Sequence, residues 1–253
     1  MPTARKYVSM AVLDGKLYAA GGQSVADNFA PSNLVERYDL ATMSWEEVAP
    51  MAEARAYHAM AALDGKLYAV GGRGLAGLLS SVERYDPAAG AWEAVAPMAT
   101  ALRVLAVAVL DGKVYAVGGY SDDDGTLSSV ERYDPAANAW EAVAPMAAER
   151  QAHAVAVLDG KLYAVGGFGL NGDCLSSVER YDPALDAWEA VAPMAEERYD
   201  HGVAVVEGKL YAVGGLGDDD GFLSSVERYD PALDAWEAVA PMGTARYSPL
   251  AAL

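Results

Sequence analysis

Short apolar runs alternate with clusters of turn residues along the whole chain, and the segment 147–194 illustrates the pattern. An apolar run at 152–158 leads into Asp159-Gly160, and a second run at 161–165 follows this pair. Apolar runs of this length bounded by turn residues are typical of strands, and an Asx-Gly pair favours a tight hairpin turn. We therefore predict two antiparallel strands joined by this turn.

Two further strands are predicted in the same segment. Gly166-Gly167 ends the second run, where the missing Cβ permits a positive φ, and a third strand is expected at 177–181. Asp182-Pro183 stops that strand, and a fourth is expected around 188–191 before Pro193 interrupts the ladder. The segment has no room for a long helix, so it is predicted to be a four-stranded meander.

The same pattern recurs five times. The repeats span 1–51, 52–98, 99–146, 147–194 and 195–242, and each has a double glycine, a V-E-R-Y-D segment, one tryptophan and a final Pro-Met. A single four-stranded sheet leaves both apolar faces in water, and units of about 40 to 50 residues bury them by stacking radially as propeller blades. The fold class is therefore all-β, a β-propeller of four-stranded antiparallel blades forming one domain over 1–253.

The repeat resembles the kelch repeat in segments such as KLYAVGG, SSVERYDP and AWEAVAPM, and the resemblance covers essentially the whole chain. It implies a propeller that binds a protein or peptide, as many family members do. It also leaves open a carbohydrate-active enzyme of the kelch type, either a sugar oxidase or a sialic-acid epimerase. An oxidase of this kind needs a Tyr, His and Cys cluster, and Cys174 is too isolated in the sequence to indicate one.

Blade number is ambiguous because residues 243–253 (GTARYSPLAAL) imitate the first strand of a sixth copy. The N-terminal segment already supplies a first strand for blade 1, so the sequence has six first strands and five of every other strand. We expect five blades. The alternative is six-bladed closure using the extra C-terminal strand, and the strand could also be exchanged in a dimer; the chain is expected to be a monomer or a strand-exchanged dimer.

Net charge and cysteine content indicate which classes of partner and which cellular compartment suit this chain. The 36 acidic residues outnumber the 18 basic ones, and the formal charge of -18 argues against nucleic acid and anionic membrane surfaces as partners. Cys174 is the single cysteine, and no signal-peptide pattern is visible, so a reducing, cytoplasmic location is expected.

Sequence differences between the five copies indicate which face of the propeller can be adapted for binding. In an up-and-down meander, the loops from strand two to three and the connections between blades share one face, and nearly all variation lies there. The varied positions after the repeated arginine begin the innermost strands and rim the channel mouth with aromatic and charged groups, which are enriched at binding hot spots. The candidate partner-binding residues are Lys6, Tyr7, Tyr57, Arg73, Arg103, Tyr120, Gln151, Phe168, Tyr199, Asp200 and Tyr247.

Two repeated features are interpreted as structural. A basic residue nine positions before the acidic-Gly turn recurs together with the glutamate of V-E-R-Y-D, and this indicates an ion pair in most copies. The three histidines, His58, His153 and His201, share one repeat position. Because equivalent positions are spread around a channel, we do not expect them to meet at one zinc ion.

Motifs for catalysis are missing from the sequence. Two G-x-G-x-x-G matches, at 72–77 and 167–172, precede a strand and not the helix that a dinucleotide site needs. No G-x-S-x-G elbow is present, and the acidic loop around Cys174 is expected to raise its thiol pKa. We expect a non-enzymatic binding scaffold without metal or cofactor, and the near-identical copies leave open a designed or consensus-like scaffold with no evolved ligand.

Overall fold

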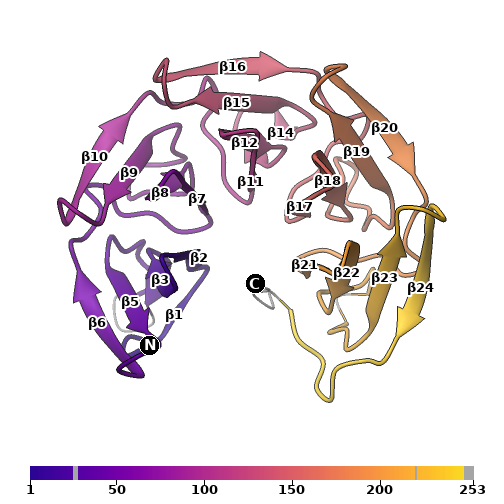
Figure 1. Cartoon of the computed structure of the whole chain (residues 1–253), viewed down its shortest axis with the longest axis horizontal. Coiled ribbons are helices and arrows are strands. Elements are labelled where there is room, and N and C mark those ends of the chain that lie inside the picture. The colour runs from indigo at the N-terminus through magenta and orange to yellow at the C-terminus, as the bar shows by residue number, and fades with distance from the viewer. Residues whose placement is uncertain (25–27, 220, 248–253) are drawn as a thin grey trace.

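The computed structural model describes residues 1–24, 28–219 and 221–247. It is a β-propeller of five four-stranded antiparallel blades arranged around a central axis, as Figure 1 shows. Within each blade the strands are adjacent in chain order, so every blade is a simple meander. The described residues contain no helix that could span a membrane.

The first three blades have the following strands. Blade 1 holds β2 (Ser9–Leu13), β3 (Lys16–Ala20), β5 (Val35–Asp39) and β6 (Ser44–Val48). Blade 2 holds β7 (Ala59–Leu63), β8 (Lys66–Val70), β9 (Val82–Asp86) and β10 (Ala91–Val95). Blade 3 holds β11 (Ala106–Leu110), β12 (Lys113–Val117), β15 (Val130–Asp134) and β16 (Ala139–Val143).

The last two blades and two short ladders complete the strands. Blade 4 holds β17 (Ala154–Leu158), β18 (Lys161–Val165), β19 (Val178–Asp182) and β20 (Ala187–Val191). Blade 5 holds β21 (Gly202–Val206), β22 (Lys209–Val213), β23 (Val226–Asp230) and β24 (Ala235–Val239). Outside the blades, β1 (Arg5–Lys6) pairs with β4 (Gln23–Ser24), and β13 (Tyr120–Ser121) pairs with β14 (Gly125–Thr126).

The core lies between blades. Each cluster joins one blade to the next, and the cluster between blades 1 and 2 is representative: Tyr18 and Met51 of blade 1 pack with Leu67 and Tyr85 of blade 2. Three more clusters repeat this arrangement between blades 2 and 3, 3 and 4, and 4 and 5. Stability therefore comes from nearest-neighbour contacts, as in other repeat proteins. Figure 1 also shows an open sector between blades 1 and 5.

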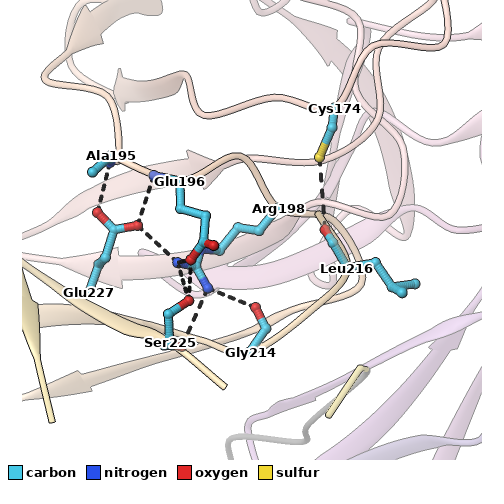
Figure 2. A network of polar contacts seen from close by, with 8 residues as sticks. All are labelled: Cys174, Ala195, Glu196, Arg198, Gly214, Leu216, Ser225 and Glu227. Carbon is cyan, nitrogen blue, oxygen red and sulfur yellow. Dashed lines mark hydrogen bonds and ion pairs between the residues drawn. The ribbon is translucent and has the colours of Figure 1, made fainter. Parts of the chain in front are cut away.

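The repeated ion pair is confirmed, and Figure 2 shows its blade 5 example. Arg198 donates from Nη1 to the Gly214 carbonyl at 2.8 Å and from Nη2 to Glu227 Oε1 at 2.9 Å. Glu227 also accepts backbone N–H groups of Ala195 and Glu196 at 2.7 and 3.2 Å. The buried carboxylate thus connects the segment that precedes a blade to the third strand of that blade. These hydrogen bonds and the ion pair compensate for the desolvation of the carboxylate.

Equivalent buried pairs join Arg5 to Glu36, Arg55 to Glu83 and Arg150 to Glu179. Blade 3 differs because Leu102 takes the place of the arginine. Its backbone still accepts a hydrogen bond from Gly72 at 2.7 Å, as the Arg55 carbonyl accepts one from Gly22 at 2.9 Å. The Leu102 side chain instead joins the apolar cluster between blades 2 and 3.

The double glycines are required by close backbone approach. Gly166 has a φ of 59°, and a Cβ there would lie 2.5 Å from the carbonyl oxygen of Arg198 and 3.0 Å from Cε1 of His201. Any larger residue would push the following blade away. The glycine pair therefore sets how closely each linker approaches the preceding blade.

Candidate functional site

The segments that precede the innermost strands, here called the linkers, and the loops that follow the double glycines meet at one end of the propeller. They contact each other through a two-residue antiparallel ladder in blade 1 and through one antiparallel bridge in each of the other blades. Lys6 faces Gln23, and the other facing pairs are Ala56 and Arg73, Arg103 and Tyr120, Gln151 and Phe168, and Tyr199 and Leu216. The bridge brings variable positions of the linker and the loop together on one rim.

Each linker makes a left-handed turn immediately after its bridge. Tyr7, Tyr57, Val104, Ala152 and Asp200 have φ values of 56°, 55°, 47°, 51° and 47°. Backbone hydrogen bonds connect them around the axis, from Tyr57 N to Tyr7 O at 3.3 Å and onwards to Asp200 N and Ala152 O at 2.8 Å. A β-branched residue such as Val104 is unfavourable in this region, so these four bonds, which run from blade 1 to blade 5, hold a strained conformation at the channel mouth.

This turn corrects the sequence prediction that these positions begin the innermost strands. Tyr57 lies before β7, which starts at Ala59, and Ala152 lies before β17, which starts at Ala154. A left-handed residue cannot continue a β ladder, so the strand begins only after it. The predicted strand at 152–158 was therefore two residues too long at its start.

The ring encloses a cavity of about 550 Å³ on the propeller axis. Five of the predicted site residues line it: Lys6, Tyr7, Tyr57, Asp200 and Tyr247. The other six, Arg73, Arg103, Tyr120, Gln151, Phe168 and Tyr199, belong to the outer bridges and surround the opening. The predicted residues thus form an inner ring and an outer rim.

Sequence reasoning missed part of the cavity lining. His58, His153 and His201 line it, together with the ring positions Val104 and Ala152. The three histidines are buried, and their ring nitrogens have no hydrogen-bond partner among the described residues. Burial lowers the pKa of each to about 3, with a smaller contribution from the neighbouring arginine. The sequence does contain one signal for these histidines, because all three occupy the same position of the repeat.

Unpaired positive charge gathers at this site. Fourteen of the 18 Lys and Arg side chains form ion pairs that recur from blade to blade. Among the residues that the structure describes, the four without an acidic partner are Lys6, Arg73, Arg103 and Arg246. Three of these four are predicted site residues on successive blades, so blades 1 to 3 carry a basic sector of the rim on an otherwise acidic protein.

Aromatic rings contact two of these cations, Lys6 and Arg103. The Lys6 ammonium lies 4.4 Å from the ring centroid of Phe29, and the Arg103 guanidinium lies 4.5 Å from that of Tyr120. Tyr7 and Tyr57 stack with their centroids 3.9 Å apart. Burial and the hydrogen bond with Tyr7 raise the pKa of Tyr57, while the nearby Arg103 and Arg73 act in the opposite direction. Cations held on aromatic faces keep their hydrogen-bond donors available for a ligand.

The opposite side of the ring carries an acid. Asp200 lines the cavity, and burial raises the pKa of its carboxyl to about 6. Phe168 and Tyr199 make an edge contact nearby on the rim, with ring centroids 5.3 Å apart. Among the candidate site residues, the cations Lys6, Arg73 and Arg103 therefore lie on blades 1 to 3, and the acid Asp200 lies on blade 5.

The described residues were also compared with the requirements of a metal site and of a reactive thiol. Within residues 1–24, 28–219 and 221–247, no group of three or more His, Cys, Asp or Glu side chains is placed to hold a metal ion. Cys174 is buried, and burial followed by the charge of Glu197 raises the pKa of its thiol to about 11. The thiol pKa is raised, as the sequence predicts, but burial is a larger cause than the acidic residues to which the prediction attributed it.

Comparison with known proteins agrees with the fold. The Kelch motif matches residues 4–52 and 54–99, and the KLHDC2/KLHL20/DRC7 Kelch-repeats domain matches residues 103–251. A solved structure described as the structure of YjhT superposes with a TM-score of 0.84 at 16% sequence identity, covering 100% of this chain and 88% of that one. A search of curated proteins gave no significant match.

Proposed function

Because the chain belongs to the kelch-repeat family of β-propellers, we propose that it is a non-enzymatic scaffold whose channel mouth binds an acidic segment of a protein or peptide. Kelch propellers provide a general binding platform, and the finer assignment rests on one observation. Among the residues that the structure describes, Lys6, Arg73 and Arg103 have no acidic partner, whereas the repeated Lys and Arg positions of the blades are paired. An acidic ligand group would supply the missing partners.

The shape of the mouth favours an extended segment over a flat surface. The cavity of about 550 Å³ is large enough for one or two side chains. Around it, Tyr57, Tyr120 and Tyr199 offer aromatic surface of the kind that dominates binding energy at hot spots. A ligand that inserts an apolar or aromatic side chain and places carboxylates over blades 1 to 3 matches both features.

The experiment uses a phage-displayed random peptide library selected against the purified chain. Selected peptides should be enriched in Asp and Glu and should bind more weakly as salt rises. The triple variant Tyr57→Ala, Arg103→Ala, Tyr199→Ala should weaken binding at least about 30-fold, because truncating a central anchor costs about 2 kcal/mol or more. Its melting temperature should stay near that of the unmodified chain.

Two further variants separate the parts of this proposal. Arg73→Gln with Arg103→Gln removes only charge, and unchanged binding by that variant would refute the acidic ligand while keeping the site. Asp64→Asn with Asp111→Asn changes the turns at the other end of blades 2 and 3 and is the matched control, since Asn tolerates their left-handed φ of 50°. Loss of binding in this control alone would place the site at the opposite face.

A further inference from the structure

The loop of one blade meets the next linker at the channel mouth through two positions, here called a seam pair. The second glycine of each blade donates its N–H to a carbonyl of the following linker, or of the equivalent segment after blade 5, as Gly72 does to Leu102 at 2.7 Å. The residues that follow this glycine and this carbonyl form the seam pair. The five seam pairs are Gln23 with Ala56, Arg73 with Arg103, Tyr120 with Gln151, Phe168 with Tyr199, and Leu216 with Tyr247.

The side chains of a seam pair are close enough to interact. At the boundary of blades 4 and 5, the rings of Phe168 and Tyr199 make an edge contact with their centroids 5.3 Å apart. Arg73 and Arg103 occupy the same two positions at the boundary of blades 2 and 3. The fold therefore brings these two arginines together as neighbours.

Tyr57 connects to both arginines through the backbone. Its neighbour Ala56 forms the bridge to Arg73. The Tyr57 carbonyl accepts the N–H of Val104, the residue after Arg103, at 2.9 Å. Burial is the main cause that raises the pKa of Tyr57, and the charges of Arg103 and Arg73 act against it, so both guanidinium groups lie near its hydroxyl.

This seam pair differs from the other four, which contain no charged residue. Neighbouring like charges repel each other and destabilise the folded state. Neither Arg73 nor Arg103 forms an ion pair with an acidic residue in the part of the chain that the structure describes. The acidic loop 122–124 lines a separate depression, together with Leu78 and Thr100. An anion bound between the two guanidinium groups would compensate for their repulsion.

A phosphomonoester matches this pair of arginines better than a carboxylate does. It carries a charge of about −1.5 to −2 at pH 7 and has three strong acceptor oxygens, so one group can bind both guanidinium groups and the Tyr57 hydroxyl. A carboxylate carries a single charge and neutralises only one of the two arginines. The pair therefore favours a ligand with one doubly charged group.

The axial cavity beside the pair suits an apolar side chain better than a phosphate. Val8, Met10 and Leu105 line it, together with three histidines that burial keeps neutral at pH 7. The carboxyl of Asp200 also lines it and would repel a phosphate. A phosphotyrosine that inserted its ring would carry its phosphate into this cavity, whereas a shorter phosphorylated side chain keeps the phosphate on the rim.

We propose that Arg73, Arg103 and Tyr57 form a binding site for a phosphoserine or phosphothreonine of the peptide ligand, with a neighbouring apolar side chain of the ligand in the axial cavity. This inference rests on the proposed function and names the charged group that the channel mouth recognises. The phosphate oxygens accept hydrogen bonds from both guanidinium groups across the boundary of blades 2 and 3.

The test begins with a synthetic peptide library that has a fixed central phosphoserine and random flanking residues. Peptides retained by the immobilised chain are resynthesised with phosphoserine, glutamate, serine or phosphotyrosine at the centre, and their dissociation constants are measured. The phosphoserine form should bind at least about tenfold more tightly than the glutamate form, because it engages both arginines. The serine form should bind most weakly, and the phosphotyrosine form should not exceed the glutamate form.

Matched substitutions locate the phosphate. Arg73→Gln and Arg103→Gln should each weaken binding of the phosphoserine peptide about tenfold and reduce its preference over the glutamate form. Because both arginines hold one group, the double variant should lose less than the product of the two single losses. Arg246→Gln removes the same charge from the segment after blade 5 and is the control; it should leave the preference unchanged.

Four results would overturn the proposal. Equal binding of the phosphoserine and glutamate forms would show that the arginines bind separate carboxylates. Tighter binding of the phosphotyrosine form would assign the phosphate to the cavity. An equal loss in Arg246→Gln would show general electrostatic attraction without a site. If the library retains no peptide while the phage-selected acidic peptides bind, the phosphate site is refuted and the proposed function stands; if neither kind of peptide binds, both are refuted.

Discussion

Arg150 Nη2 lies 2.9 Å from Glu179 Oε1, and the two side chains are 0% and 5% exposed. Arg150→Met should cost about 3 to 5 kcal/mol in the free energy of unfolding, because the carboxylate of Glu179 is left buried without its counter-charge. Urea denaturation measures the change. Arg180→Met is the control, since its pair with Glu189 is largely exposed and should cost less than about 1 kcal/mol. Equal losses in the two variants would contradict a structural role for the buried pair.

Trp140 and Trp45 occupy the same repeat position with different neighbours. Trp140 donates to the Ala96 carbonyl of blade 2 at 2.9 Å and packs on the cluster between blades 2 and 3. Trp45 has no preceding blade among the described residues. Both side chains are partly buried, so Trp140→Ala should cost about 2 to 3 kcal/mol and Trp45→Ala about 1 kcal/mol. A larger loss for Trp45→Ala would show that blade 1 has a neighbour on the side of Trp45.

The buried histidines predict a loss of stability in acid. Burial lowers the pKa of His153 to about 3, whereas an unfolded histidine titrates near pH 6.5. Between these values the unfolded chain binds the extra proton, so the contribution of His153 is fully present above about pH 6.5 and is lost as pH falls. His153→Leu should reduce the loss of unfolding free energy between pH 7.5 and pH 5 by about 2 kcal/mol. Identical pH profiles for the variant and the unmodified chain would show that the imidazole is solvated.

Asp200 should have the opposite pH dependence. Burial raises the pKa of its carboxyl to about 6, so the folded chain keeps a proton that the unfolded chain loses near pH 4. Its contribution to stability is therefore present at pH 4 and declines as pH rises to about 6. Asp200→Asn removes that decline, and Asn tolerates the left-handed backbone at this position. We expect the variant to melt higher than the unmodified chain at pH 7 and close to it at pH 4; a variant that melts lower at pH 7 would contradict this assignment.

The sequence alone determined what is local to one repeat. The strand order, the Asp159-Gly160 hairpin turn and the buried arginine–glutamate pair were all predictable, because they depend on alternation, turn chemistry and spacing that recur in every copy. The sequence also indicated which loops vary, and it identified residues of both the inner ring and the outer rim.

Only the tertiary structure decided how the repeats meet. The left-handed turns at Tyr57 and Val104 arise from hydrogen bonds between linkers of successive blades, which no single copy encodes. Whether Tyr211 is buried depends on the blade beside it, and its residue type is the same as that of the buried Tyr163. The repeat determines the structure within each blade, whereas packing against a neighbouring blade determines which of its faces are buried.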